Sequence, residues 1–186
     1  MTEKALNGKK IAFLVAHEGI EQVELTEPWK AVEEAGGEPV LVCTRPGTAQ
    51  AFRHLDAADT FDVDVTVADA ASSDYLGLVL PGGVANPDAL RMDSDAVDFV
   101  KSFFDDDRPV AAICHAPWAL VEANVLDGRT LTSWPSLQTD IRNAGATWVD
   151  EEVVVDGALV TSRNPDDLPA FNQAVVDLLT HAAQAT

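Results

Sequence analysis

Short apolar runs alternate with amphipathic segments along this chain, and that order restricts the folds open to it. Residues 10–16 and 39–44 are apolar runs typical of buried strands. Between them, residues 23–35 carry apolar side chains at helical spacing, and this pattern stops at Gly36-Gly37. The alternation predicts an α/β fold with a doubly wound, mostly parallel sheet sandwiched by helices, in which sites form at the carboxyl ends of the strands.

The rest of the chain continues this order. The polar segment 45–59 is expected to be an insertion loop, and Asp156-Gly157 is typical of a tight turn between antiparallel strands. The further predicted strands are 61–67 (half exposed), 75–80, 109–113, 128–132, 148–155 and 158–162, and the further predicted helices are 94–104, 137–143 and 167–182.

The length and the cysteine content of the chain predict one domain without disulfide bonds. A chain of 186 residues is long enough for a single core, and we expect one domain over 8–182 with flexible tails at 1–7 and 183–186. Cys43 and Cys114 have no spacing typical of a disulfide framework or a metal site. The polar start of the chain and the lack of a long apolar segment favour the cytoplasm over the secretory route or a membrane.

The chain is strongly acidic, with a formal net charge of −19 and 47% hydrophobic residues. The acids are spread over segments such as 105–107, 150–152 and 166–167, so we expect them to coat a folded surface. Such a surface disfavours nucleic acid as a partner. Because salt at about 1 M shortens the screening length to about 3 Å, we hypothesise a salt-rich, halophilic cytoplasm, with an ordinary acidic and highly soluble protein as the alternative.

Cys114 lies where a predicted strand gives way to a predicted helix, and is followed directly by His115. The unpaired amides at the start of that helix favour a thiolate, so we expect the pKa of Cys114 to fall to roughly 5 or 6 and the residue to be a nucleophile. The alternative is a small buried core cysteine. Two further strand ends, 17–21 and 81–83, should converge on it, and the amides of Gly83 and His115 could hold an oxyanion there, although Gly82-Gly83 alone is also a common turn.

Five motifs along the chain resemble the ThiJ/PfpI superfamily, most closely the PfpI-type intracellular proteases within the flavodoxin-like, class I glutamine amidotransferase-like fold. The resemblance covers nearly everything from Lys10 to Leu179 and is specific because five motifs occur in order. The matching segments are 18–25, 78–83, 112–117, 143–150 and 161–168.

The resemblance implies a role for each matching side chain. Cys114 is the nucleophile on a strained turn, His115 is its acid or base, and Glu21 is the carboxyl partner of the sulfur, with a pKa raised by burial. In the alternative interpretation Glu21 is only an acid at a helix N-terminus, stabilised by the helix dipole, and the same alternative applies to Glu18 and Glu24.

The resemblance also implies a homo-oligomer (a dimer, a trimer of dimers or a hexamer) in which a carboxylate reaches the histidine of the next subunit. The matching position is Asp88, one methylene shorter than the usual Glu, and Asp88 is equally suited to cap a helix. His17, Trp118, Trp134 and Arg163 are candidate lining residues of the substrate pocket, with packing or surface roles as the alternative for each.

The family suggests a cysteine-dependent hydrolase or lyase that acts on small carbonyl compounds. The expected activity is stress-protective removal of methylglyoxal or glyoxal adducts (deglycase) or conversion of the free aldehydes (glyoxalase), with no metal or organic cofactor. The closest alternative is an intracellular cysteine peptidase acting on peptides. A redox sensor or a chaperone-like stress protein is a non-enzymatic alternative, and an amidotransferase is weaker because no synthetase domain or later His-x-Glu pair is present.

The halophilic hypothesis predicts a salt-dependent melting temperature. Screening should relieve the repulsion among the surplus carboxylates, so the midpoint of thermal unfolding should rise by several degrees between about 0.1 M and about 2 M KCl. Differential scanning fluorimetry across a KCl series measures it, and a flat or falling midpoint contradicts the hypothesis.

Overall fold

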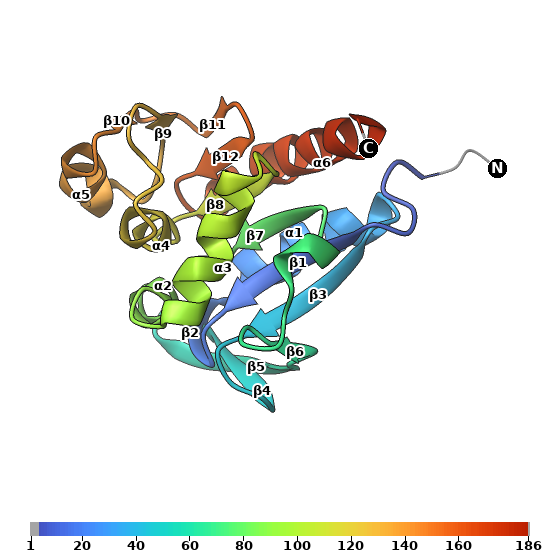
Figure 1. Ribbon diagram of the computed structural model, residues 1–186. Coiled ribbons are helices and arrows are strands. Elements are labelled where there is room, and N and C mark those ends of the chain that lie inside the picture. The colour runs from blue at the N-terminus through green and yellow to red at the C-terminus, as the bar shows by residue number, and fades with distance from the viewer. Residues whose placement is uncertain (1–3, 186) are drawn as a thin grey trace.

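The computed structural model describes residues 4–185 and contains a twisted seven-stranded sheet (Figure 1). All neighbouring strands are parallel except the edge pair β11 and β12. The strand order is β11 (Val153–Asp156), β12 (Leu159–Ser162), β8 (Val110–Ile113), β7 (Gly77–Leu80), β1 (Lys10–Val15), β3 (Glu38–Cys43) and β6 (Val65–Thr66). This confirms the predicted doubly wound α/β fold, and the hairpin turn at Asp156-Gly157 joins the antiparallel pair as expected.

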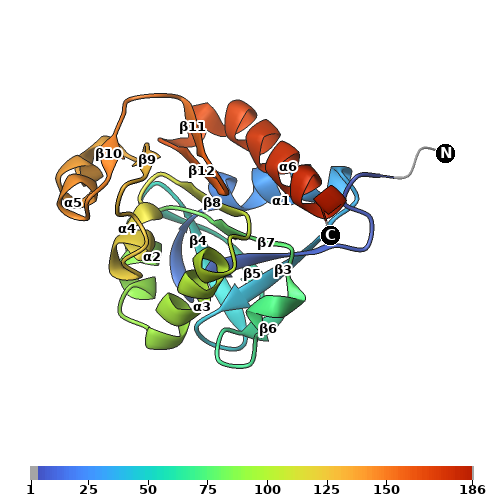
Figure 2. The ribbon, with the colours of Figure 1, turned by 45° about the horizontal axis from the view of Figure 1, so that its top comes forward.

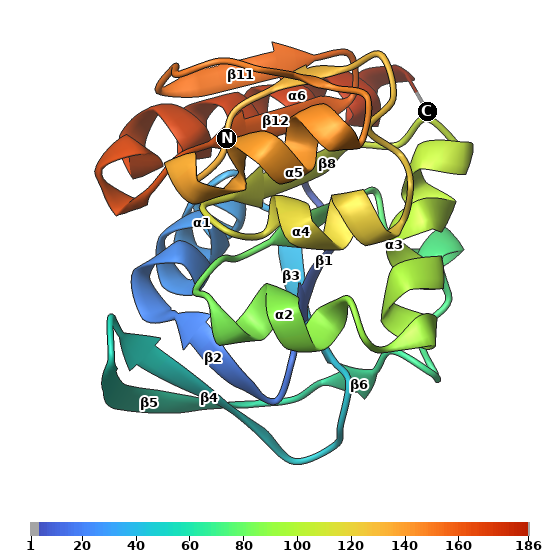
Figure 3. The ribbon, with the colours of Figure 1, turned by 90° about the vertical axis from the view of Figure 1, so that its left-hand side faces the viewer.

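Helices cover both faces of the sheet. The helices α1 (Gln22–Glu34) and α6 (Leu168–Ala185) pack together on one face, as Figure 2 shows. The other face carries α3 (Ser94–Asp105), while α2 (Ala85–Leu90), α4 (Pro117–Glu122) and α5 (Gln138–Asn143) gather toward the carboxyl ends of the strands (Figure 3). Three short 3₁₀ turns lie at Ser72–Asp74, Pro135–Leu137 and Pro165–Asp167.

The central strand β1 shows why the sheet needs two helical layers. Its residues are apolar on both sides: Ala12 and Leu14 belong to the core beneath α3, whereas Ile11, Phe13 and Val15 belong to the core beneath α1 and α6. All five side chains are fully buried. A continuous apolar run is therefore the pattern of a parallel strand covered on both faces.

A second, three-stranded sheet corrects the prediction of an insertion loop at 45–59. It consists of β2 (Glu18–Glu21), β4 (Thr48–Arg53) and β5 (Asp56–Asp62), with β4 antiparallel to β5. The apolar alternation is weak because β4 buries only the small side chains Ala49 and Ala51. The predicted strand 61–67 is consequently divided between β5 and β6.

Two other elements differ from the prediction. The helix α2 was not expected, since six residues hold too few turns to show a period. The predicted strand 148–155 is two pieces, β10 (Thr147–Trp148), which pairs with β9 (Thr130–Leu131), and β11. The break falls in the acidic segment 149–152.

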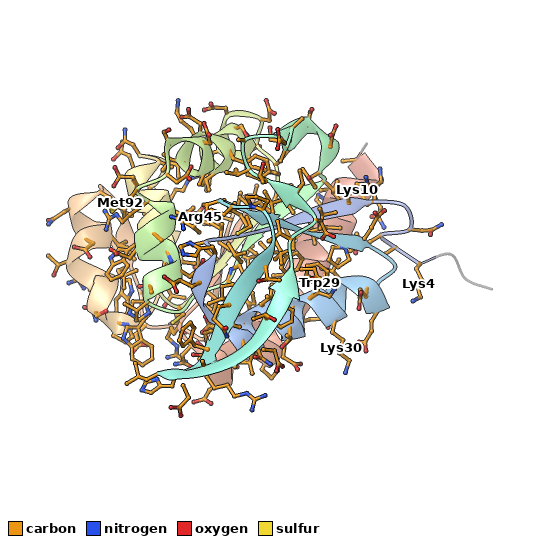
Figure 4. The ribbon with its side chains drawn as sticks, turned by 90° about the horizontal axis from the view of Figure 1, so that it is seen from below. Lys4, Lys10, Trp29, Lys30, Arg45 and Met92 are labelled. Carbon is orange, nitrogen blue, oxygen red and sulfur yellow. The ribbon has the colours of Figure 1, made fainter. Side chains whose placement is uncertain are left out.

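The chain ends were expected to be flexible tails. Residues 1–3 and 186 lie outside the described residues. Leu6, within the expected tail 1–7, is fully buried and its amide donates to Ala35 O at 3.1 Å, and α6 continues to Ala185. Figure 4 shows charged side chains such as Lys4 and Lys30 projecting from the outside of the fold. None of the helices within residues 4–185 is long and apolar enough to cross a bilayer.

Candidate active site

Cys114 sits on a strained turn directly after β8. Its φ is +64°, in the left-handed region that non-glycine residues avoid at a cost of about 1–2 kcal/mol. Two backbone hydrogen bonds hold this conformation: Cys114 N donates to Ser162 O at 3.1 Å, and Trp134 N donates to Cys114 O at 2.9 Å. The turn therefore aims the sulfur away from the strand, across the end of the sheet.

The imidazole of His115 lies beside that sulfur and is held between two indole rings. Its Nδ1 is 3.2 Å from Cys114 Sγ. The ring of Trp134 stacks on it with centroids 5.8 Å apart, and the ring of Trp118 meets it edge-on at 5.3 Å. Burial lowers the pKa of His115, so the imidazole is neutral at neutral pH and is available as a base.

The carboxyl group beside the sulfur belongs to Glu24, which corrects the expectation for Glu21. Glu24 is fully buried in the first turn of α1, and neither of its carboxyl oxygens makes a complete hydrogen bond within residues 4–185. The groups that face it are the thiol of Cys114 and the amides of Gly82 and Gly83. Burial raises the pKa of Glu24 to about 8, and the nearby carboxylate of Glu21 acts in the same direction, whereas the thiol and the two amides act in the opposite direction.

Glu21 has a different place because it precedes the helix. It occupies the N-cap position of α1 in extended backbone, and its Oε2 accepts a hydrogen bond from His54 N at 3.0 Å. His54 itself has a φ of +61° in the turn between β4 and β5. Glu21 therefore tethers the tip of that hairpin beside the cleft.

The thiol of Cys114 is buried as well, and the expectation of a lowered pKa is wrong for this site. Burial raises the pKa of Cys114, and the nearby Glu24 raises it further, while the amides of Gly83 and His115 act in the opposite direction. The following helix contributes little, since α4 has six residues, begins at Pro117 and so lacks one amide hydrogen. Both Glu24 and Cys114 are therefore predominantly protonated in the resting site at neutral pH.

Gly82 allows this close packing. A Cβ at Gly82 would overlap Glu24 Oε2 and lie 2.7 Å from Cys114 Cβ. Any side chain here would push the acid and the thiol apart.

A cleft of about 580 Å³ opens over the sulfur. Of the expected site residues, it brings together Cys114, His115, Glu21, Gly83 and Trp134, with Gly82 packed directly behind. The full lining is Gly19, Glu21, Glu24, Phe52, His54, Leu55, Gly83, Val84, Ala85, Cys114, His115, Trp134 and Pro165.

Besides Gly82, four expected residues lie outside this lining. His17 pairs with Glu18 at 3.4 Å, and Asp88 is exposed in the first turn of α2 without capping it. Trp118 lies behind His115. Its Nε1 donates to Asp140 Oδ2 at 2.9 Å.

Arg163 is the fourth, and it is engaged in two ion pairs. Its guanidinium donates to both carboxylate oxygens of Asp167 at 2.9 Å and to Asp150 Oδ1 at 2.8 Å. These acids raise its pKa further above its ordinary value. The arrangement stabilises the loop after β12 and leaves the guanidinium away from the cleft.

The lining residues that the sequence did not predict come from the second sheet and from loop positions. Phe52, His54 and Leu55 reach the cleft because the β4–β5 hairpin folds against β2. Val84 and Ala85 start α2. Among residues 4–185, no group of three or more His, Cys, Asp or Glu side chains is placed to hold a metal ion.

The sequence of this chain is similar to a protein-family model and to proteins of known name. A family model described as the DJ-1/PfpI family matches residues 9–178. General stress protein 18 of Bacillus subtilis is 46% identical over 173 residues, covering 92% of this chain and 98% of that protein. A second B. subtilis relative, named "Putative cysteine protease YraA", is 41% identical over 171 residues with the same coverage.

Solved structures agree in fold. Drosophila melanogaster DJ-1beta superposes with a TM-score of 0.84 at 28% identity, covering 95% of this chain and 94% of that one. A two-domain protein from Anabaena variabilis with DJ-1/ThiJ/PfpI-like and ferritin-like domains gives a TM-score of 0.87 at 34% identity. The match covers 92% of this chain and 48% of the Anabaena protein.

The raised pKa of Glu24 predicts a pH-dependent stability. The folded protein keeps this proton to about pH 8, whereas an unperturbed carboxyl releases it near 4.5. The contribution of this proton to the free energy of unfolding is therefore complete below pH 4.5. It is lost as the pH rises to about 8, and the total loss is up to about 5 kcal/mol.

Glu24→Gln, which keeps the shape of the side chain and does not ionise, should remove this loss. Urea unfolding at pH 5 and pH 8.5 measures it as the difference between wild type and variant. Glu27→Gln, a change to an exposed acid of the same helix α1, is the matched control and should leave the pH dependence of wild type in place. Identical pH profiles for wild type and Glu24→Gln would contradict the assignment.

Proposed function

The chain belongs to the DJ-1/PfpI family, and we propose that it is a Cys114-dependent enzyme that converts small carbonyl compounds, as a deglycase or glyoxalase acting on methylglyoxal or glyoxal and their adducts. The observation that carries the proposal is one sulfur faced by a neutral base, a neutral carboxyl group and two amides at the floor of an open cleft. The relative named general stress protein 18 supports a protective role. A cytoplasmic location is part of this proposal.

The first step is addition of the sulfur to an aldehyde. The thiol proton of Cys114 moves to Nδ1 of His115, 3.2 Å away. The sulfur then bonds to the aldehyde carbon, the carbonyl electron pair moves to oxygen, and that oxygen takes a proton from Glu24 or the imidazolium. The amides of Gly83 and His115 face the sulfur and stabilise the negative charge during transfer.

The remaining steps regenerate the thiol. For a 2-oxoaldehyde, a base removes the hydrogen from the former aldehyde carbon as a proton and a proton is delivered to the neighbouring carbon, which leaves a thioester. Water hydrolyses the thioester to a 2-hydroxy acid and returns the thiol, so the net reaction adds one water. For an amine adduct, the sulfur first displaces the amine.

A cysteine peptidase is the second candidate, supported by the name of the 41% identical relative. Peptide hydrolysis needs a histidine oriented to protonate the leaving amine, usually by a carboxylate. Within residues 4–185, no carboxylate is hydrogen-bonded to His115, whose ring contacts are with Trp118 and Trp134. A homo-oligomer in which Asp88 of one subunit completes the site of the next stays a prediction.

A redox sensor is the third candidate. The neutral carboxyl of Glu24 has a proton to donate to an oxidised sulfur at Cys114. This is the role expected from the sequence for Glu21. This role needs a thiolate that peroxide reaches, and burial of Cys114 opposes it. A chaperone-like role has no support in the site itself.

Substitution of the cysteine separates these candidates. Cys114→Ala should lower lactate formation from methylglyoxal by at least about a thousandfold, because the covalent route is lost. Cys43→Ala, a change to a buried cysteine in β3 outside the cleft, is the control and should keep the activity. Fluorogenic peptide hydrolysis, measured in parallel, should be absent or unaffected by Cys114→Ala.

Cys114-dependent peptide hydrolysis without lactate formation would overturn the proposal in favour of a peptidase. Mild peroxide followed by mass spectrometry tests the sensor. Two added oxygens at Cys114 with no turnover of any aldehyde or peptide would also overturn the enzymatic proposal.

A further inference from the structure

Exposed apolar side chains are concentrated at the mouth of the Cys114 cleft. Leu55 is 83% exposed, Val84 56% and Trp134 40%, and all three line the cleft. Within residues 4–185 the large hydrophobic side chains left exposed are Val23, Leu55, Val84, Met92, Trp134 and Val155. Half of this set therefore borders one cleft, which is the pattern of a surface that binds an apolar group.

The cleft lining offers no permanent positive charge to a ligand. Its titratable lining consists of Glu21, Glu24, Cys114 and the two histidines His54 and His115, with no lysine or arginine. Arg163, the cation expected there, is held by Asp167 and Asp150. The chain as a whole carries −19. An anionic group in this cleft would meet an acidic wall and no counter-charge.

Resting on the proposed function, we propose that the cleft selects uncharged carbonyl compounds with an apolar substituent, such as aryl or long-chain 2-oxoaldehydes, and discriminates against carbonyl compounds that carry a carboxylate or phosphate. The substituent packs against Leu55, Val84 and Trp134 while the aldehyde carbon reaches Cys114. Glu21, on the cleft wall, is the specificity-determining charge.

Matched maleimides test the selectivity without any need for turnover. N-phenylmaleimide should modify Cys114 at least about tenfold faster than N-(4-carboxyphenyl)maleimide in 2 M KCl, where the long-range field is screened. Glu21→Gln, which keeps an acceptor for His54 N, should reduce that ratio several-fold. Leu55→Ser should slow N-phenylmaleimide relative to N-methylmaleimide, whereas Met92→Ser, an equally exposed change outside the cleft lining, should not.

The two proposals fail in different ways. Equal rates for the neutral and charged maleimides would overturn the selectivity. Discrimination between the maleimides, together with no turnover of phenylglyoxal or methylglyoxal, would overturn the proposed function and leave the selectivity standing. If phenylglyoxal is turned over, its kcat/KM should exceed that of 4-carboxyphenylglyoxal by a similar factor, and a reversed order would overturn the selectivity.

A separate observation concerns Asn86, a fully buried polar residue in α2. Its Oδ1 accepts from Ala16 N at 2.7 Å, next to the end of β1. Its Nδ2 donates to Pro81 O at 2.9 Å and to Gly82 O at 3.1 Å. One side chain therefore fixes two of the loops that meet at the site.

The bond to Gly82 O determines where the next amide points. The chain has no cis peptide bonds among the described residues, and in a planar trans peptide the carbonyl and the following N–H point in opposite directions. Gly82 O is held by Asn86 Nδ2 and by Glu21 N, which donates at 3.3 Å. The N–H of Gly83 is consequently directed the other way, where it faces Cys114.

The structure assigns to Asn86 the role of a positioning residue that turns the Gly83 amide toward the sulfur of Cys114. Without its amide donor, the carbonyl of Gly82 keeps only the longer bond from Glu21 N at 3.3 Å. The peptide between Gly82 and Gly83 then rotates more easily, since glycine places little restriction on either side. The site would then lose one of the two backbone donors that stabilise negative charge on sulfur or substrate oxygen.

Asn86→Asp is the sharpest variant, since it keeps an acceptor for Ala16 N and turns the donor into an oxygen that repels Pro81 O and Gly82 O. It should slow iodoacetamide modification of Cys114 at least about tenfold at pH 7.5 and move the midpoint of its pH profile upward. Kinetic constants, where turnover is measured, should show the loss in kcat with KM changed less than about twofold.

Two further variants keep this assignment falsifiable. Val100→Ala removes buried volume from α3, in the core on the other side of the sheet from Cys114, and should leave the pH profile of wild type unchanged. If Asn86→Asp does not fold, Asn86→Ala should show a smaller shift in the same direction. A folded Asn86 variant with the rate and pH profile of wild type would overturn the assignment.

Discussion

The carboxyl group of Glu24 is buried against the thiol of Cys114, where neither group can be solvated as an anion. Moving a charge into such a place costs several kcal/mol unless hydrogen bonds compensate, and here only the amides of Gly82, Gly83 and His115 are at hand. Both groups therefore stay protonated until a substrate or an oxidant arrives. This constraint makes the resting site uncharged, and reactivity depends on moving a proton within the cluster and not on a permanently ionised thiolate.

The fold delivers these groups from separate segments of the chain. The strand β8 ends at the strained Cys114, the loop after β7 supplies the glycines, and the first turn of α1 supplies Glu24. Cys114 and the glycine loop are held by hydrogen bonds that extend away from the sulfur, to Ser162 and Trp134 in the first case and to Asn86 in the second. The second sheet adds an apolar wall, so an uncharged proton-transfer centre lies at the floor of an apolar cleft. That combination suits addition to carbonyl groups.

The sequence predicted the parallel sheet because buried parallel strands are continuous apolar runs, as in residues 10–16. It also predicted the convergence of the glycine loop and Cys114, since carboxyl ends of neighbouring strands meet at one edge. It did not indicate that Glu24, and not Glu21, is the carboxyl group beside the sulfur. A signal was present, because Glu24, Pro28 and Val32 recur every four residues on the buried face of α1. The β4–β5 hairpin was not predicted because its buried side chains are alanines. The burial of the Cys114 thiol was not predicted because it depends on contacts between residues that are remote in sequence.

The protonation state of Glu24 tests the central claim most directly. Isotope-edited infrared difference spectroscopy between wild type and Glu24→Gln isolates the carboxyl band of this residue across a pH series. The account predicts a protonated carboxyl at pH 7 that titrates near 8. A band that titrates below pH 5, as a solvated glutamate does, would contradict it.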